Sequence, residues 1–223
     1  MKVKILFNII LFFIFFNIIL NQESPSGLFS ITRIHYPGGG DWYSDPSSIP
    51  NLLSFVKNNT NIQLTIDENR AKIGDDAFYN GNYYYMTGHG NISFSEKEIS
   101  ILRKRLLNGA FLHADDNYGM DQSFRREFKK VFPDKQWVEL PSNHEIFNIF
   151  YKFNNGLPKI HEHNNDRPQA LALFHNKKII VLYTFESDLG DGWENKNVHH
   201  DPEDLRELAL KMGTNIIIYS IIQ

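Results

Sequence analysis

A helix followed directly by a buried strand, between residues 95 and 115, constrains the fold of this chain more than any other segment. Ser95 and Glu98 have the spacing of an N-terminal capping box, and Gly109 stands where the helix is expected to end. The apolar residues 110–112 then predict a strand. Helix and strand patterns alternate in this way through the first two-thirds of the chain, which predicts an α/β domain with a mainly parallel sheet.

The other elements follow from apolar periodicity and from turn residues. Strands are expected at 28–36, 62–66, 83–86, 137–140 and 216–219, and helices after Asp45-Pro46, after Asp121 and after Asp201-Pro202 as far as Gly213. Two more strands, 170–174 and 178–185, flank a turn at Asn176-Lys177 and predict a small antiparallel addition to the sheet.

Residues 1–24 have the pattern of an export signal, with a basic start followed by the apolar run 5–20. This run is shorter than the roughly 20 residues that span a bilayer comfortably, so a cleaved signal and an uncleaved N-terminal anchor both stay open. We expect an exported protein of the periplasm or cell envelope, in contact with a membrane only through this segment if it is uncleaved. Residues 28–223 then suit a single domain.

Composition excludes several classes of protein. The chain has no cysteine, so disulfides, thiolate metal ligands and a cysteine nucleophile are excluded. The net charge of −3 predicts no general attraction to nucleic acid. Neither a Gly-x-Ser-x-Gly nor a His-Glu-x-x-His motif occurs, which argues against a typical serine α/β-hydrolase and a typical zinc protease.

Four polar residues at predicted strand ends are the candidate catalytic residues: His113, Asp115, Asp116 and His89. Open α/β sheets form their ligand sites at such ends, and polar groups buried there need hydrogen bonds, ion pairs or a metal. Along a strand, His113 and Asp115 share a face while Asp116 points elsewhere. The alternative interpretation is a hydrogen-bonded network that only stabilises the turn.

His161 and His163 are candidate ligands for a divalent metal. In an extended segment both side chains project to one side, and imidazole with carboxylate suits zinc and related cations. The alternative is a pair of exposed or structural histidines, because the metal interpretation needs a third ligand. His113 or Asp115 supplies one only if the 152–168 loop folds back over the strand end.

Several further residues are candidates for binding a small-molecule ligand. Glycines after strands let a ligand approach the backbone, aromatic rings suit sugars, and acids at a strand exit suit a cation or a tight turn. The candidates are Gly39, Gly40, Asp41, Trp42, Gly88, Asn117, Tyr118, Glu186 and Asp188.

The chain resembles an uncharacterised bacterial family, domain of unknown function 4159, from about Phe29 to Tyr219. The segments that carry the resemblance are 32–36 with 38–42, 86–90, 107–119, 157–163 and 187–194. The resemblance implies no established activity. In some members the domain follows a membrane-anchored region similar to aerotolerance proteins, which points to an envelope protein partner.

A more distant likeness, carried by 108–113 and 143–147, is to class I glutamine amidotransferase-like domains of the trehalose-utilisation branch. It implies a three-layer, flavodoxin-like fold with His113 where amidotransferases carry a cysteine, and therefore excludes glutamine amidotransferase activity. Fold likeness alone says little more about function. Two hypotheses follow: an exported enzyme of hydrolytic or sugar-modifying type, and a non-catalytic ligand- or protein-binding module of an envelope complex.

Overall fold

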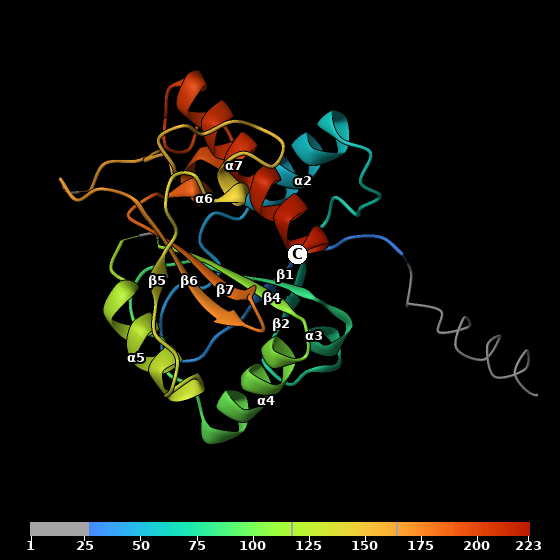
Figure 1. Cartoon of the computed structure of the whole chain (residues 1–223), viewed down its shortest axis with the longest axis vertical. Coiled ribbons are helices and arrows are strands. Elements are labelled where there is room, and N and C mark those ends of the chain that lie inside the picture. Colours follow the sequence, from blue (N-terminus) through green and yellow to red (C-terminus); the bar gives the residue numbers. More distant parts are fainter. Residues whose placement is uncertain (1–26, 117, 164) are drawn as a thin grey trace, which may run out of the picture.

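The computed structural model describes residues 27–116, 118–163 and 165–223. Seven strands form one sheet in the order β2-β1-β3-β4-β7-β6-β5 (Figure 1). They are β1 (Thr32–Ile34), β2 (Asn69–Ala71), β3 (Tyr83–Met86), β4 (Phe111–Asp115), β5 (Val138–Glu139), β6 (Gln169–His175) and β7 (Lys178–Phe185). Neighbours from β2 to β7 are parallel, and β6 is antiparallel to both β7 and β5. The predicted α/β class and the mainly parallel sheet are confirmed.

Helices cover both faces of the sheet, with α2, α6 and α7 on one face and α3, α4 and α5 on the other (Figure 1). Their bounds are α2 (Ser48–Asn59), α3 (Asp76–Asn80), α4 (Glu96–Leu107), α5 (Asp121–Val131), α6 (Leu189–Trp193) and α7 (Glu203–Ile222), with a 3₁₀ turn, η1, at Glu145–Phe147. The predicted Ser95–Glu98 capping box begins α4.

The central strands are apolar on both sides because each side meets a helix layer. In β3, Tyr83 and Tyr85 join the core under α2, α6 and α7, while Tyr84 and Met86 join the core under α4 and α5. This double burial leaves the ends of the strands, and the loops beyond them, as the places where polar side chains gather.

Two predicted strands are wrong. The segment 216–219 is helical, because α7 continues past Gly213 to Ile222. A Cβ at Gly213 would lie 2.6 Å from Leu52 Cδ1 and 2.9 Å from Trp193, so this glycine allows close helix packing and does not end the helix. The segment 62–66 contributes one isolated bridge, and β2 lies further along the chain.

The antiparallel addition is confirmed as the β6–β7 hairpin. Its turn residues Asn176 and Lys177 both have positive φ, 49° and 68°, as the twist of a two-residue hairpin requires. The predicted signal or anchor, residues 1–24, lies outside the described residues. Among the helices that are described, none has the length and apolar character needed to cross a membrane.

Candidate functional site

Loops at the carboxyl edge of the parallel strands bring aspartates and histidines together. These aspartates and histidines lie in the β1–α2 connection, in the loop before β6, at the β7–α6 junction and in the segment between α6 and α7. The Asp–His cluster consists of Asp45, His161, His163, Asp188, Asp191, His199 and Asp201.

Asp191 lies at the centre of this cluster. Its Oδ2 atom is 3.4 Å from His199 Nδ1 and 3.9 Å from His161 Nδ1. On the other side of its ring, His199 Nε2 is 3.7 Å from Asp45 Oδ1. Two groups of three potential ligands therefore share Asp191: one with His161 and His163, the other with Asp45 and His199. Within each group the ligand atoms all lie within 4.8 Å of one another.

Asp188 and Asp201 orient the histidines of the loop before β6. His163 Nε2 lies 2.7 Å from Asp188 Oδ2, and His161 Nδ1 lies 3.3 Å from Asp201 Oδ1. Because Asp188 binds Nε2 of His163, the Nδ1 atom of that ring is left for another partner. Carboxylates that hold a ring nitrogen in this way are typical neighbours of metal-binding histidines.

The carboxyl groups of the cluster are removed from solvent. The side chains of Asp188, Asp191 and Asp201 are 2 %, 4 % and 6 % exposed. Burial, together with repulsion from neighbouring carboxylates, raises the pKa of Asp188 to about 10 and that of Asp191 to about 7. Among the described residues, one oxygen of each of these three groups has no hydrogen-bond partner. Such buried carboxylates are unfavourable unless a cation compensates them.

Asp115 lies directly beside the cluster and fixes the position of α6. Its Oδ2 atom accepts from the Gly190 amide at 2.7 Å, and its Oδ1 atom accepts from the Thr184 hydroxyl. Burial raises the pKa of Asp115 to about 8. A Cβ at Gly190 would lie 2.9 Å from Asp45 Oδ2 and 3.0 Å from the Tyr85 hydroxyl, so only glycine lets α6 approach so closely.

His113 does not reach the cluster. Its side chain is completely buried, with Nε2 3.0 Å from Thr184 Oγ1 and Nδ1 3.4 Å from the Tyr83 hydroxyl. Its ring packs edge-on against Tyr85 and Trp193. Burial lowers the pKa of His113 to about 3. The structure therefore gives His113 the surroundings of a neutral, hydrogen-bonded core residue.

Asp116 and Glu186 lie near the cluster but outside both ligand groups. Burial raises the pKa of Asp116 to about 6, and its neighbours are Tyr183 of β7 and Asp121 at the start of α5. Asp115 and Asp116 thus diverge, as their consecutive positions predict. Glu186 forms an ion pair with Lys159 at 3.4 Å.

His89 and Asp41 form a hydrogen-bonded pair beyond the end of β3. Asp41 Oδ2 is 3.0 Å from His89 Nδ1, and Oδ1 accepts from the His89 amide. Burial raises the pKa of Asp41, but these bonds outweigh it and hold the pKa below its usual value. The adjacent glycines are required: a Cβ at Gly40 would lie 2.9 Å from the His89 carbonyl oxygen, and a Cβ at Gly88 2.8 Å from the Asp41 carbonyl oxygen. The His89 side chain remains 51 % exposed.

The remaining predicted residues lie at separate places near this edge of the sheet. Tyr118 stacks on His163 with ring centroids 4.7 Å apart, so it borders the Asp–His cluster. Trp42 instead stacks on His35 at 4.0 Å. Gly39 has no atom within 4 Å of the place a Cβ would take, so its backbone is open. Asn117 lies outside the described residues.

The sequence pattern does not single out Asp45, His199 or Asp201. Asp45 and Asp201 both precede proline and resemble helix starts, so their sequence context does not indicate that they belong to the Asp–His cluster. Asp191 belongs to a glycine-rich segment typical of a turn. The signal that sequence reasoning overlooks is the run His199-His200-Asp201 directly before a helix, at the same edge of the sheet as His161.

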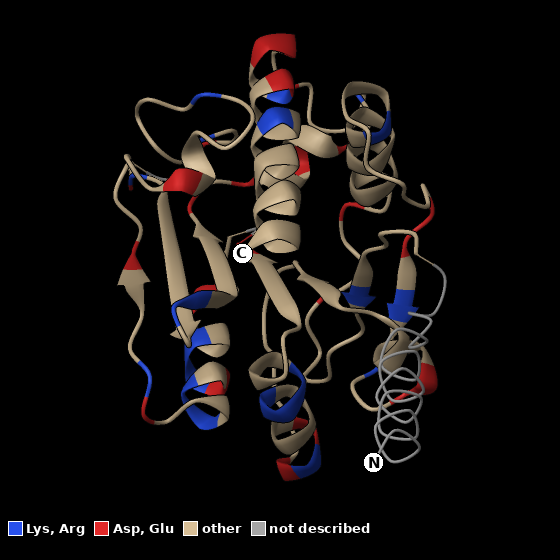
Figure 2. Cartoon of the chain, turned by 45° about the vertical axis from the view of Figure 1, so that its right-hand side comes forward, with Lys and Arg blue, Asp and Glu red and all other residues tan. Residues whose placement is uncertain are grey.

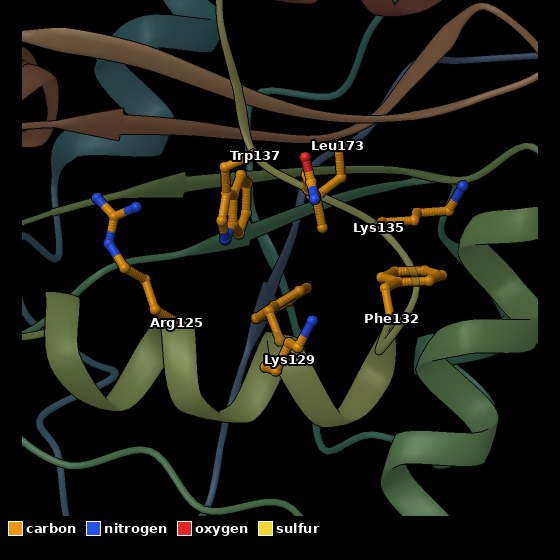
Figure 3. Close-up of a pocket in the computed structure, with 8 residues that line it drawn as sticks. Arg125, Lys129, Phe132, Lys135, Trp137 and Leu173 are labelled. Carbon is orange, nitrogen blue, oxygen red and sulfur yellow. The ribbon is translucent and has the colours of Figure 1, made fainter.

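A separate cavity of about 330 Å³ lies between α5 and the segment that leads into β5 (Figure 3). Lys and Arg gather on α4 and α5 (Figure 2), and Arg125, Lys129 and Lys135 surround Phe132 and Trp137 in the cavity. These cations already bind the protein's own oxygens, two backbone carbonyls and one carboxylate. The cavity therefore shows no buried polar group that awaits a ligand.

Together these features define a three-layer α/β domain with a buried aspartate–histidine cluster at the carboxyl edge of its sheet. The family model described as "Domain of unknown function (DUF4159)" matches residues 30–221, so the chain belongs to this family, as its motifs predict. No curated protein matches the sequence. Because the family's description names no activity, function has to be argued from the cluster itself.

Proposed function

We propose that this domain is a metal-dependent hydrolase and that His161, His163 and Asp191 bind its divalent cation. The observation that carries the proposal is the convergence of both predicted histidines on one buried aspartate. Two imidazoles and a carboxylate are the ligand set of several catalytic zinc sites. In this proposal Asp191 is the third metal ligand, a role for which the sequence suggested His113 or Asp115.

Accessibility favours a catalytic over a purely structural cation. His161 and His163 are 34 % and 25 % exposed, whereas Asp191 is 4 % exposed, so the group opens to solvent on its histidine side. A divalent cation held by His161, His163 and Asp191 would leave a position for water and would lower the pKa of that water. It would thereby supply a nucleophile suited to ester or amide hydrolysis.

We propose that His89 assists this chemistry. Its Nδ1 atom is bound to the Asp41 carboxylate, so Nδ1 carries the proton and Nε2 is left at the exposed side of the ring. An imidazole oriented by a carboxylate is a common proton donor or acceptor in hydrolysis.

Elemental analysis of the purified protein after dialysis tests the metal. We expect bound zinc or a similar cation in the wild type and a lower cation content in His163→Ala. His175→Ala is the matched control, because His175 ends β6 at the opposite edge of the sheet, and it should keep the metal. Wild-type protein that takes up no divalent cation would refute the proposal.

Hydrolysis of p-nitrophenyl acetate and p-nitrophenyl phosphate by metal-loaded and metal-free protein tests the activity. We expect turnover only with the cation present and at least a 100-fold loss in His163→Ala. A protein that binds the cation tightly but hydrolyses neither ester class nor amide substrates would instead favour the non-catalytic binding module.

A further inference from the structure

We propose that the Asp–His cluster binds a second divalent cation between Asp45, Asp191 and His199, with Asp191 bridging the two metals. This inference rests on the proposed function, because Asp191 is also the third ligand of the first cation. The second position lies deeper, between α6 and the β1–α2 loop, since Asp45 and Asp191 are both 4 % exposed at their side chains.

The backbone around Asp45 is built to point its carboxylate at α6. Asp45 has a positive φ of 54°, a conformation that costs energy in a non-glycine residue. The buried guanidinium of Arg33 donates to the Asp45 carbonyl at 3.0 Å, and the Ser48 hydroxyl donates to the same oxygen at 2.7 Å. These bonds fix the main chain, so the side chain extends toward Gly190, where a Cβ would meet Asp45 Oδ2.

The spacing of the ligand atoms fits a shared cation better than hydrogen bonds. Bonds of about 2.0–2.1 Å in a tetrahedral site place ligand atoms roughly 3.3 Å apart. The separation of His199 Nδ1 from Asp191 Oδ2 is 3.4 Å, close to this spacing and longer than an ordinary N–H···O bond. One atom each of Asp45, Asp191 and His199 lies within 4.8 Å of the other two, so a shared cation would draw these side chains closer together.

Unpartnered polar atoms point to the same place. Asp191 Oδ1 and His199 Nε2 have no hydrogen-bond partner among the described residues. Asp191 is more than nine-tenths buried, and buried polar groups are nearly always satisfied. Asp191 Oδ2 faces both His161 and His199 while Oδ1 has no partner among the described residues, so this carboxyl group has the oxygens that a bridging ligand needs.

The charge of the cluster calls for more than one cation. Its four aspartates are each at most 6 % exposed at the side chain. Among the described residues, the ion pairs recorded for Asp188, Asp191 and Asp201 are all with histidines. When all four aspartates ionise, one divalent cation balances two of their charges and a pair of cations balances all four. Paired metals of this kind hold both the attacking and the leaving oxygen of a hydrolysed bond.

Equilibrium dialysis of the metal-free, full-length protein against Zn²⁺, followed by elemental analysis, tests the second site. We expect two ions per chain in the wild type, one in His199→Ala, one in His163→Ala and fewer than one in Asp191→Ala. His175→Ala should bind two. Asp45→Asn should bind the same number of ions as His199→Ala. If circular dichroism shows that one of these variants folds poorly, the other still tests the second site.

Each result is decisive. A wild type that binds one ion, kept in His199→Ala and lost in His163→Ala, overturns the second site and leaves the proposed function standing. One ion lost in His199→Ala but kept in His163→Ala overturns both the first site and the bridged pair, and leaves a single cation at the deeper position. No bound ion overturns both. With Mn²⁺, the wild type should give the electron paramagnetic resonance spectrum of a coupled pair and His199→Ala that of a single ion.

Discussion

The buried histidine His113 makes the stability of this domain sensitive to acid, and His113→Gln should remove that sensitivity. Folding keeps His113 neutral, since burial lowers its pKa to about 3, whereas an unfolded chain protonates histidine below about pH 6.5. Acid therefore favours the unfolded state. The contribution of His113 is complete above pH 6.5 and declines by about 1.4 kcal/mol per pH unit as the pH falls toward 3.

Between pH 6.5 and 4.5 this amounts to about 3 kcal/mol, a large part of the 5–15 kcal/mol typical of a domain. The assay is urea unfolding of wild type and His113→Gln in EDTA at half-unit steps from pH 7.5 to 4.5. The free energy of unfolding of the wild type should fall more steeply than that of the variant. Other titrating groups are common to both proteins, so the difference between the curves isolates His113.

Tyr83→Phe is the matched control. It removes the hydroxyl 3.4 Å from His113 Nδ1 but leaves the imidazole in place. This variant should lose about 1 kcal/mol at every pH in the range, in parallel with the wild type. Parallel curves for wild type and His113→Gln would refute the reasoning, because they would mean that His113 is protonated alike in the folded and unfolded chain.

Two further predictions concern the packing of α6 against α7 and the buried carboxylate of Glu127. Gly192→Ala should lower stability by about 1–3 kcal/mol and the melting temperature by several degrees, because the new Cβ clashes with Ala209 in α7. Differential scanning calorimetry measures this change, and Gly27→Ala, whose new Cβ meets no atom within 4 Å, is the control. An unchanged melting temperature in Gly192→Ala would contradict the packing argument. Glu127→Gln should cost about 1.5–3 kcal/mol at pH 7, since the buried carboxylate accepts from the Phe94 amide and from two cationic side chains. The pKa of Glu127 is lowered in the folded protein, so this cost should persist above pH 5 and shrink as the pH falls below 4.5; a cost that stays constant into acid would contradict it.

Local signals predict much of this fold. The α4 capping box, the hairpin turn at Asn176-Lys177 and the apolar strands β3 and β4 each combine short-range chemistry with a clear period. Gly213 shows where such reasoning fails. Its role depends on Leu52 and Trp193, which reach it only through the tertiary packing of α2 and α6 against α7.

Less of the candidate site is predictable from the sequence, because its residues come together only through tertiary packing. His161 and His163 are found from their spacing, and Asp188 from its place after β7. Asp45 and His199 come from connections that carry no local pattern, and only the approach of α6 to β4 brings them to Asp191. The prominent His-Ala-Asp-Asp strand end is divided in the structure, because His113 lies wholly in the core while Asp115 lies beside the cluster.

The spread of the Asp–His cluster along the chain has a consequence for biogenesis. Its residues begin before α2 and end just before α7, the 20-residue helix that closes the fold. A growing chain therefore exposes His161 and His163 well before His199 and Asp201 exist, and until α6 docks they are two isolated histidines with little hold on a metal. The two proposed cation sites would be complete only once His199 is synthesised, so a full cation content would distinguish finished molecules from chains truncated before this residue.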